Sequence, residues 1–286
     1  MTEKNKTVGG TLYLVATPIG NRADISERAL KVLSEVDFIA AEDTRNSGLL
    51  LSHYGISKPF VSYHEHNKYE RGEHIANRLE SGESCALITD AGTPAISDPG
   101  EDIVALCAAR GIPVSSIPGA CAAVTALSMS ALPTRRFVFE GFLPPDKGER
   151  RRRLALLANE TRTVILYEAP HKLKRTLGDM LSAWGDRRIS ICRELTKLNE
   201  EVIRTTIAEA VRLYEENDPR GEYVLVIDGA AEAATADEYP EDPEAHVQSL
   251  MDEGLSRMDA IKAAAKARGL SKGAFYKQLL AESEAE

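Results

Sequence analysis

The stretch DAGTPAISDPG, residues 90–100, follows directly on the apolar run CALIT of residues 85–89. The apolar run predicts a buried strand, and the residues from Glu101 onward predict a helix. In open α/β sheets, ligands bind at the carboxyl ends of strands, where glycines let backbone groups come close to them. Pro94 and Pro99 restrict the loop to few conformations. We therefore predict a ligand-binding loop at the edge of an α/β sheet, because a purely structural turn would not need so many such residues.

On both sides of this loop, residues 11–131 alternate short apolar runs with amphipathic helical patterns. Such alternation predicts an α/β domain whose mostly parallel sheet is covered on both faces. We expect strands over residues 12–16, 38–41, 60–62, 85–89 and 114–117. We expect helices over residues 27–35, 47–53, 71–80, 102–109 and 120–130.

A hinge at Leu132 and Pro133 is predicted to lead into a second α/β domain, residues 132–230. The same reading of apolar runs and helical periodicity applies there. The expected strands cover residues 137–141, 163–167, 189–193 and 223–228, and the expected helices cover residues 148–159, 172–182 and 207–216.

The chain changes character after residue 230. Residues 231–243 are acidic and rich in alanine and proline, which is typical of a linker. Residues 244–286 predict a small helical domain, in which a turn at residues 268–271 joins two short helices as in a helix-turn-helix. Its scattered lysines and arginines fit a nucleic-acid surface, and a dimerisation or docking module explains the pattern equally well.

The charge of the 286-residue chain is unevenly spread. The net charge is −9, yet residues 134–205 hold 16 lysines and arginines against 10 acids, and the remainder holds 19 against 34. One basic face on an acidic protein permits an anionic partner. The four cysteines form no Cys-x-x-Cys pair, which favours reduced thiols. Because no apolar run reaches about 18 residues and none lies near the start, we expect a cytoplasmic protein without a membrane partner.

Familiar cofactor fingerprints are missing from this sequence. It contains no G-x-G-x-x-G, no G-x-x-x-x-G-K-[ST] and no G-x-S-x-G, which argues against the usual dinucleotide, P-loop and hydrolase sites. Four other segments instead follow predicted strands of the first domain: ATPIGN (16–21), AEDTR (41–45), DAGTP (90–94) and SIPGA (116–120). From the residues alone, we predict an α/β cleft lined by backbone groups, with aspartate and arginine nearby.

These segments resemble the motifs of the tetrapyrrole methylases, a family that uses S-adenosylmethionine without a Rossmann glycine fingerprint. The resemblance covers residues 11–229 and implies two α/β domains with the cofactor folded in the cleft between them. It rests on LYLVATPIGN, IAAEDTRNSGLLL, SYHEHN, LITDAGTPAISDPG, SIPGACAAVTAL, FVFEGFLPP, ILYEAPHKL, CRELTKLNEE and GEYVLVIDG. AEDTR, SYHEHN and CRELTK favour the members that modify ribosomal RNA over the precorrin and uroporphyrinogen methylases.

The reaction implied by the resemblance is transfer of a methyl group to the ribose 2′-hydroxyl of a decoding-region cytidine in 16S rRNA. The implied partner is 16S rRNA or the small ribosomal subunit, and the family implies a homodimer. The cofactor-binding residues that the resemblance implies are Pro18, Asp90, Gly92, Thr93, Pro94, Ile96, Ser97, Ser116, Ile117, Pro118, Ala120, Tyr167, Glu168 and Ala169.

Two charged pairs are the candidates for catalysis. Asp43 accepts or steers the hydroxyl proton in our first hypothesis, and Arg45 holds the ribose or its phosphate. A salt bridge that merely holds the loop explains this pair equally well. Glu194 and Lys197 are second candidates, because a lysine beside a hydroxyl favours its oxyanion. A surface strand end is the competing interpretation for them.

A basic run is the candidate RNA surface. KGERRRR, residues 147–153, opens a predicted helix, and its charges fit phosphate contacts as well as a solvated helix face. The candidate RNA-binding residues are Arg135, Arg136, Lys147, Arg150, Arg151, Arg152 and Arg153. His64 and His66 lack further ligands, so we predict no metal site. Two other functions stay open: a corrin or porphyrin precursor methylase, and a ligand-sensing DNA-binding regulator that reads DNA with its helical tail.

Overall fold

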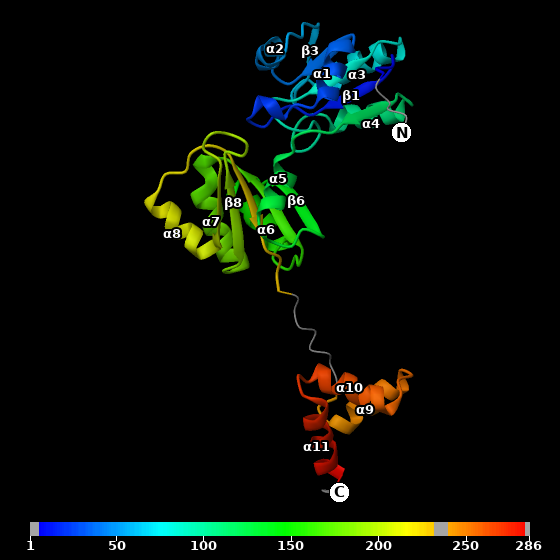
Figure 1. Ribbon diagram of the computed structural model, residues 1–286, viewed down its shortest axis with the longest axis vertical. Coiled ribbons are helices and arrows are strands. Elements are labelled where there is room, and N and C mark those ends of the chain that lie inside the picture. Colours follow the sequence, from blue (N-terminus) through cyan, green and yellow to red (C-terminus); the bar gives the residue numbers. More distant parts are fainter. Residues whose placement is uncertain (1–5, 232–239, 284–286) are drawn as a thin grey trace. The chain divides into compact units, whose positions relative to one another are not determined.

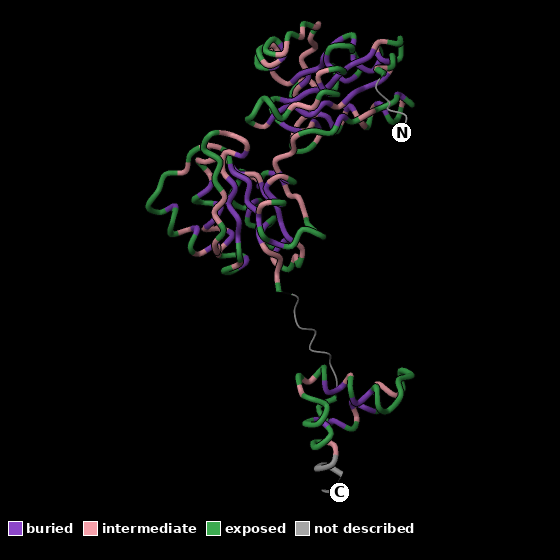
Figure 2. Tube along the Cα trace, viewed as in Figure 1, coloured by how far each residue is buried: buried purple, intermediate pink, exposed green. Residues whose placement is uncertain are grey.

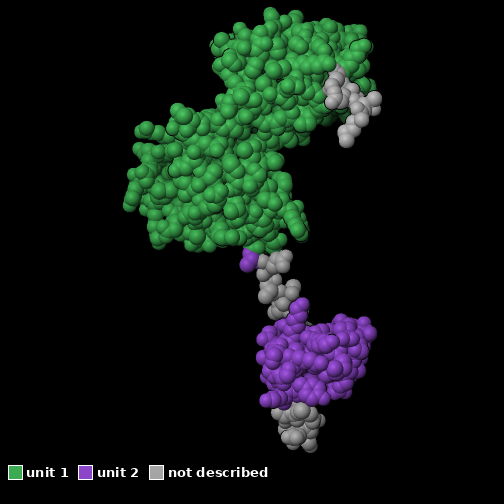
Figure 3. Space-filling model, viewed as in Figure 1, with its two compact units in different colours: residues 1–230 green, residues 231–286 purple. Residues whose placement is uncertain are grey.

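The computed structural model describes residues 6–231 and 240–283, with side chains described up to residue 279. The chain forms two compact units, residues 1–230 and 231–286 (Figure 3). The first unit holds two β-sheets and the second holds helices (Figure 1). Within the described residues, no helix is both long enough and apolar enough to cross a membrane.

The first sheet is entirely parallel, with the strand order β3-β2-β4-β1-β5. Its strands are β1 (Leu12–Val15), β2 (Phe38–Ala41), β3 (Phe60–Ser62), β4 (Cys85–Ile88) and β5 (Val114–Ile117). Every residue of β2 and β4 is buried, because helices cover both faces of the sheet (Figure 2). Helices α1 (Glu27–Glu35) and α2 (Thr44–His53) pack on one face, and α3 (Lys68–Glu80) and α4 (Glu101–Ala109) pack on the other.

The second sheet is mixed, with the strand order β6-β7-β10-β8-β9. Its strands are β6 (Phe137–Phe142), β7 (Thr163–Glu168), β8 (Arg188–Arg193), β9 (Glu201–Thr206) and β10 (Tyr223–Ile227). Only β6 and β7 pair in parallel. Helices α6 (Lys147–Leu156), α7 (Pro170–Trp184) and α8 (Ile207–Glu216) cover one face, and α5 (Ala122–Met129) packs on the other. Two α/β sheets within one unit confirm the predicted fold class.

Strand β9 is absent from the prediction. Its residues, EVIRTT, are all exposed or half-buried at the edge of the sheet, so the strand carries no continuous apolar run. The remaining strands differ from the predicted ranges by at most one residue at either end.

The second unit packs three helices around its own small core. These are α9 (Pro243–Asp252), α10 (Arg257–Ala267) and α11 (Lys272–Ser283). Val247, Ile261 and Phe275 are buried between them. The predicted linker of residues 231–243 falls largely outside the described residues, and α9 begins at Pro243 behind the N-cap Asp242.

Candidate active site

Three loops meet at the carboxyl edge of the first sheet. Thr17, after β1, and Gly92, after β4, exchange backbone hydrogen bonds of 2.8 and 3.1 Å. The Thr93 hydroxyl donates to the carbonyl of Ala120, which follows β5, over 2.9 Å. Gly92 has a φ of 87°, in the left-handed region that glycine adopts without strain. Residues 90–100 are therefore fastened to their neighbouring loops, as a rigid binding loop requires.

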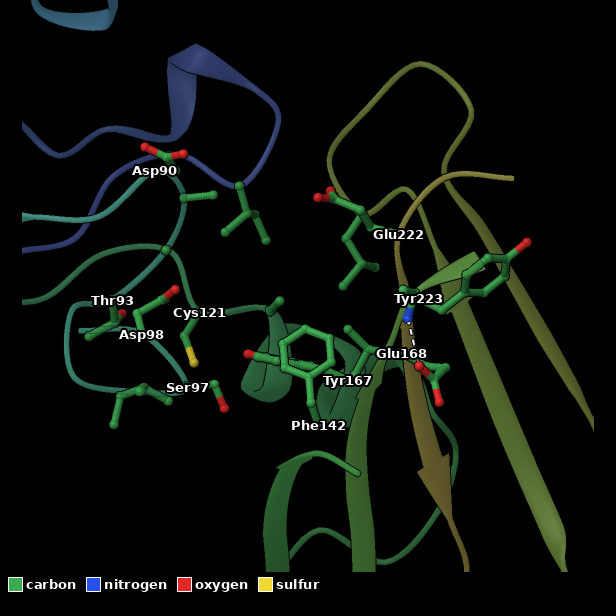
Figure 4. A pocket seen from close by; sticks show the side chains of 18 of the residues that line it. Asp90, Thr93, Ser97, Asp98, Cys121, Phe142, Tyr167, Glu168, Glu222 and Tyr223 are labelled. Carbon is green, nitrogen blue, oxygen red and sulfur yellow. Dashed lines mark hydrogen bonds between the residues drawn. The ribbon is translucent and has the colours of Figure 1, made fainter. Parts of the chain in front are cut away.

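A cavity of about 590 Å³ opens between this loop and the second sheet. Its size lies in the range of small-molecule and cofactor sites. Figure 4 shows Thr93, Ser97 and Asp98 on one side and Phe142 and Tyr167 on the other. Predicted cofactor residues that line the cavity are Asp90, Gly92, Thr93, Ile96, Ser97, Tyr167, Glu168 and Ala169.

The other predicted cofactor residues lie around the cavity without lining it. Pro18 lines a neighbouring cavity. The remaining ones are Pro94, Ser116, Ile117, Pro118 and Ala120. Ile117 is buried in the core of the first sheet. Ala120 contributes its carbonyl to Thr93. These residues belong to the loops around the cavity and do not line it.

Close packing joins the two halves of the cleft at Gly141 in β6. The register of β6 against β7 shifts between Phe139 and Gly141, and Gly141 has a φ of 68°. A Cβ atom at Gly141 would lie 2.6 Å from the Oγ atom of Ser97, so any other residue type would have to displace the Ser97 side chain. The bulge therefore lets the binding loop approach the second sheet.

Tyr167 forms the aromatic wall of the cavity. Its ring packs edge-on against Phe139 and Phe142, with ring centroids 5.0 and 5.5 Å away. Its hydroxyl oxygen accepts a hydrogen bond of 3.1 Å from the backbone N–H of Ala123 in α5. Burial raises the pKa of Tyr167 to about 12, so the hydroxyl stays protonated at neutral pH. Tyr167 thus acts as a fixed wall.

Glu168 is a buried carboxylate that supports the next helix. One of its oxygens accepts from the N–H of Ala169 over 2.8 Å, and the other accepts from the hydroxyl of Thr176 (Figure 4 shows the first bond). Pro170 follows at the first turn of α7, where its missing N–H costs nothing. The motif YEAP therefore places one cavity wall and begins a helix.

Five carboxylates line the cavity, and three of them interact through their charges. Glu42, Asp90 and Asp98 line it together. Burial, followed by the charges of Glu42 and Asp90, raises the pKa of Asp98 to about 7. Burial, followed by the charge of Asp90, also raises the pKa of Glu42. Such like-charge crowding disfavours the ionised acids, and a cationic group bound in the cavity would relieve it.

A second cavity of about 390 Å³ adjoins the first. The two share Ile19, Asp90, Ala91 and Glu222 in their walls. In Figure 4, Asp90 and Glu222 lie on opposite sides of the opening. Glu42, Asp98 and Glu222 are not among the site residues predicted from the sequence. All three lie inside quoted motifs and could have been found there as acids beside predicted strands or inside the binding loop.

Asp43 and Arg45 lie outside the linings of both cavities. Asp43 is the N-cap of α2, and its Oδ1 accepts from the N–H groups of Arg45 and Asn46 over 2.8 and 3.4 Å. Its Oδ2 lies 3.2 Å from a guanidinium nitrogen of Arg45. The hydrogen bond from the Arg45 side chain lowers the pKa of Asp43. These contacts fit the loop-holding interpretation, and the catalytic role of the pair stays a prediction.

Glu194 and Lys197 fasten the loop after β8. The Glu194 Oε1 atom accepts from the Lys197 Nζ over 2.8 Å and from the backbone N–H of Glu222 over 3.0 Å. Lys197 also donates to the Glu222 carboxylate over 2.7 Å. The hydrogen bond from Lys197 lowers the pKa of Glu194. Of this predicted pair, Lys197 lines the second cavity, and Glu194 lines neither.

The basic run divides into exposed and buried members. Arg150 is only 1% exposed, so the prediction that it contacts RNA is wrong. Its guanidinium lies 2.7 Å from the Asp179 carboxylate and donates to the Pro145 carbonyl over 3.0 Å. Arg153 pairs with Glu140. The exposed members, whose RNA contact stays a prediction, are Arg135, Arg136, Lys147, Arg151, Arg152 and Arg153.

Solved structures share this two-sheet fold. A cobalt precorrin-4 methyltransferase matches with a TM-score of 0.57 at 18% identity, covering 77% of this chain and 95% of that one. Diphthine synthase matches with a TM-score of 0.58 at 14% identity, covering 77% and 90%. A uroporphyrin-III C-methyltransferase from Thermus thermophilus, complexed with S-adenosyl homocysteine, matches with a TM-score of 0.54 at 16% identity, covering 76% and 97%. The fold is therefore one that methyltransferases use.

The family follows from the sequence. The model of the tetrapyrrole (corrin/porphyrin) methylases matches residues 11–211, and the chain belongs to this family. Its relatives include proteins named ribosomal RNA small subunit methyltransferase I. The one from Synechocystis is 46% identical over 97% of this chain and 99% of its own length. Those from Halalkalibacterium halodurans and Escherichia coli O157:H7 are 48% and 42% identical, over 93% and 95% of both chains.

Proposed function

We propose that this protein transfers a methyl group from S-adenosylmethionine to ribosomal RNA of the small subunit. The observation that carries this proposal is identity of 42–48% over nearly the whole chain to relatives of that name. The finer part of the proposal, a decoding-region cytidine methylated on its ribose 2′-hydroxyl, rests on the motifs AEDTR, SYHEHN and CRELTK.

The larger cavity fits S-adenosylmethionine in size and charge. Its volume of about 590 Å³ suits a ligand of that class. The crowded acids Glu42, Asp90 and Asp98 favour a sulfonium cation over a phosphate. Apolar wall residues such as Ile96 and Tyr167 suit an adenine ring.

In the proposed mechanism, residues of this chain hold the methyl donor in place and remove the proton of the ribose hydroxyl. Bound S-adenosylmethionine supplies a methyl group for in-line displacement by the ribose oxygen. Ser97, Tyr167 and the fastened loop fix the position of the donor pocket, which lowers the entropic part of the barrier. Asp90 lies where the two cavities meet, and we assign it to receive the proton of the ribose hydroxyl.

The proposal also covers the location, the partner and the oligomeric state of the protein. We infer a cytoplasmic protein that binds 16S rRNA or the small ribosomal subunit, with the exposed arginines of α6 against the RNA. The charge of residues 134–205 supports this orientation, because phosphate contacts dominate nucleic-acid affinity. The homodimer stays a prediction, which light scattering of the full chain tests.

The experiment is methyl transfer from labelled S-adenosylmethionine to 30S subunits that lack this modification, with the labelled nucleoside identified by mass spectrometry. A 2′-O-methylated cytidine supports the proposal. Subunits that already carry the methyl group serve as the control and should take up no label. Binding of S-adenosylmethionine without labelling of RNA contradicts it and indicates a small-molecule acceptor, as in a corrin or porphyrin precursor methylase.

A further inference from the structure

The second cavity adjoins the cofactor cavity and draws its walls from both halves of the unit. It measures about 390 Å³ and shares Asp90 and Glu222 with the first cavity. A methyl acceptor must reach the donor through such a junction, because displacement needs the attacking oxygen in line with the methyl group. We propose that this second cavity binds one unstacked nucleotide of the RNA, with its ribose at the junction. This inference rests on the proposed function.

The cavity combines an apolar side with unpaired polar groups. Pro18, Ile19 and Leu50 line it, together with Leu49, whose side chain is 72% exposed despite being apolar. Ser47 is only 3% exposed, and its hydroxyl has no hydrogen-bond partner among the described residues. A base lying against the leucines would cover this apolar surface.

One wall of the second cavity also carries a cationic side chain. Arg22 lines it and forms no ion pair within the described part of the chain. Its backbone is held in place, since the Tyr54 hydroxyl donates to the Arg22 carbonyl over 2.6 Å. Lys197, the other cation in the wall, already pairs with two carboxylates. Arg22 is therefore the group available for a phosphate.

Contacts between loops hold the cavity open as one site. The Thr196 hydroxyl accepts from the backbone N–H of Asn21 over 3.0 Å, which joins the loop after β1 to the loop after β8. A Cβ atom at Gly20 would lie 2.5 Å from the Lys197 Cγ atom, so the two loops approach closely. The walls of the cavity are thus set before RNA arrives.

The carboxylates where the two cavities meet fit a ribose better than a phosphate. Carboxylate oxygens accept hydrogen bonds from hydroxyl groups and repel phosphates, so Asp90 and Glu222 favour the sugar at the junction. Arg22 lines only the second cavity and is absent from the first, which places the phosphate away from the methyl donor. An RNA helix displays its 2′-hydroxyls in the minor groove, but a helix is too wide to enter a cavity of about 390 Å³, so a nucleotide that fills this cavity has to be unstacked.

The test compares Arg22→Gln with Arg28→Gln, because Arg28 is also an exposed cation and lines neither cavity. We expect Arg22→Gln to lower kcat/KM for 30S subunits about 10- to 100-fold, the effect of one charge-assisted hydrogen bond. The Kd for S-adenosylmethionine should stay unchanged, and Arg28→Gln should behave as the wild type. Arg22→Lys, which keeps the charge, should recover part of the loss.

A direct binding measurement uses cytidine 3′-monophosphate with S-adenosylhomocysteine present. Saturation-transfer NMR should show the nucleotide on the wild type and on Arg28→Gln, and not on Arg22→Gln. Equal losses of activity in both variants, or unchanged activity in Arg22→Gln, overturn the inference while 30S methylation by the wild type stands. Nucleotide binding by a wild type that never labels 30S subunits overturns the proposed function instead and leaves the subsite standing.

Discussion

Replacing Arg150 by methionine should destabilise the protein without weakening RNA binding. Arg150 is 1% exposed and lies 2.7 Å from Asp179, whose side chain is 12% exposed. Removing one partner of a buried pair costs about 3–5 kcal/mol, because the other charge stays buried. Arg151 also reaches Asp179, at 3.5 Å, and compensates part of that charge. We therefore expect a loss of about 2–3 kcal/mol.

Thermal unfolding measures this loss. For a folded unit of this size, about 2–3 kcal/mol lowers Tm by about 4–12 °C. Arg152→Gln is the matched control, because Arg152 is exposed on the same helix and should change stability by less than about 0.5 kcal/mol. The double variant Arg150→Met, Asp179→Leu should regain most of the loss, since it leaves no unpaired charge. An unchanged Tm in Arg150→Met, together with a shallower salt dependence of RNA binding, would refute this reasoning.

Three further perturbations test other parts of the site. The pKa of Asp98 in the folded protein is about 7, above the ordinary value for aspartate, so this group makes stability fall as pH rises from about 4 to about 7. Asp98→Asn should flatten the fall of Tm over that range, and an unchanged slope contradicts this. Asp43→Ala removes the N-cap of α2, and urea unfolding should show a loss of about 1 kcal/mol while kcat for methyl transfer stays near that of the wild type. Gly141→Ala places a side chain against the Ser97 Oγ atom at a positive φ, so it should lower the free energy of unfolding by about 1–3 kcal/mol. It should also weaken S-adenosylmethionine binding in calorimetry, and an unchanged affinity would contradict the role given to the bulge.

Local patterns predict the strands and the binding loop but leave side-chain directions open. The strands of the first sheet are readable because burial on both faces demands continuous apolar runs, as in FIAA of β2. The edge strand β9 is not predicted, because its exposed and half-buried residues form no continuous apolar run. The loop of residues 90–100 is readable because its glycines and prolines act locally.

Charged motifs are harder to interpret, because pairing depends on tertiary contacts. Asp43 resembles a catalytic carboxylate because Arg45 is close to it in the sequence. An aspartate directly before a helix is also a strong N-cap signal. The run RRRR looks uniform, but a helix turns its residues to different sides. Arg150 lies four residues before the buried Leu154 and therefore shares its inward face. The junction of two cavities at Asp90 and Glu222 depends on how two sheets pack, which no single segment of the chain encodes.

The strand order β3-β2-β4-β1-β5 also has a consequence for synthesis on the ribosome. β1 and β2 are made first, yet they are not neighbours, because each pairs with β4. At about 5–20 residues per second, β4 emerges about 4–15 s after β1. Throughout that interval the apolar residues of β1 and β2 lack their central partner. A chaperone that binds nascent chains should therefore be released from this protein only after residue 88 has left the exit tunnel.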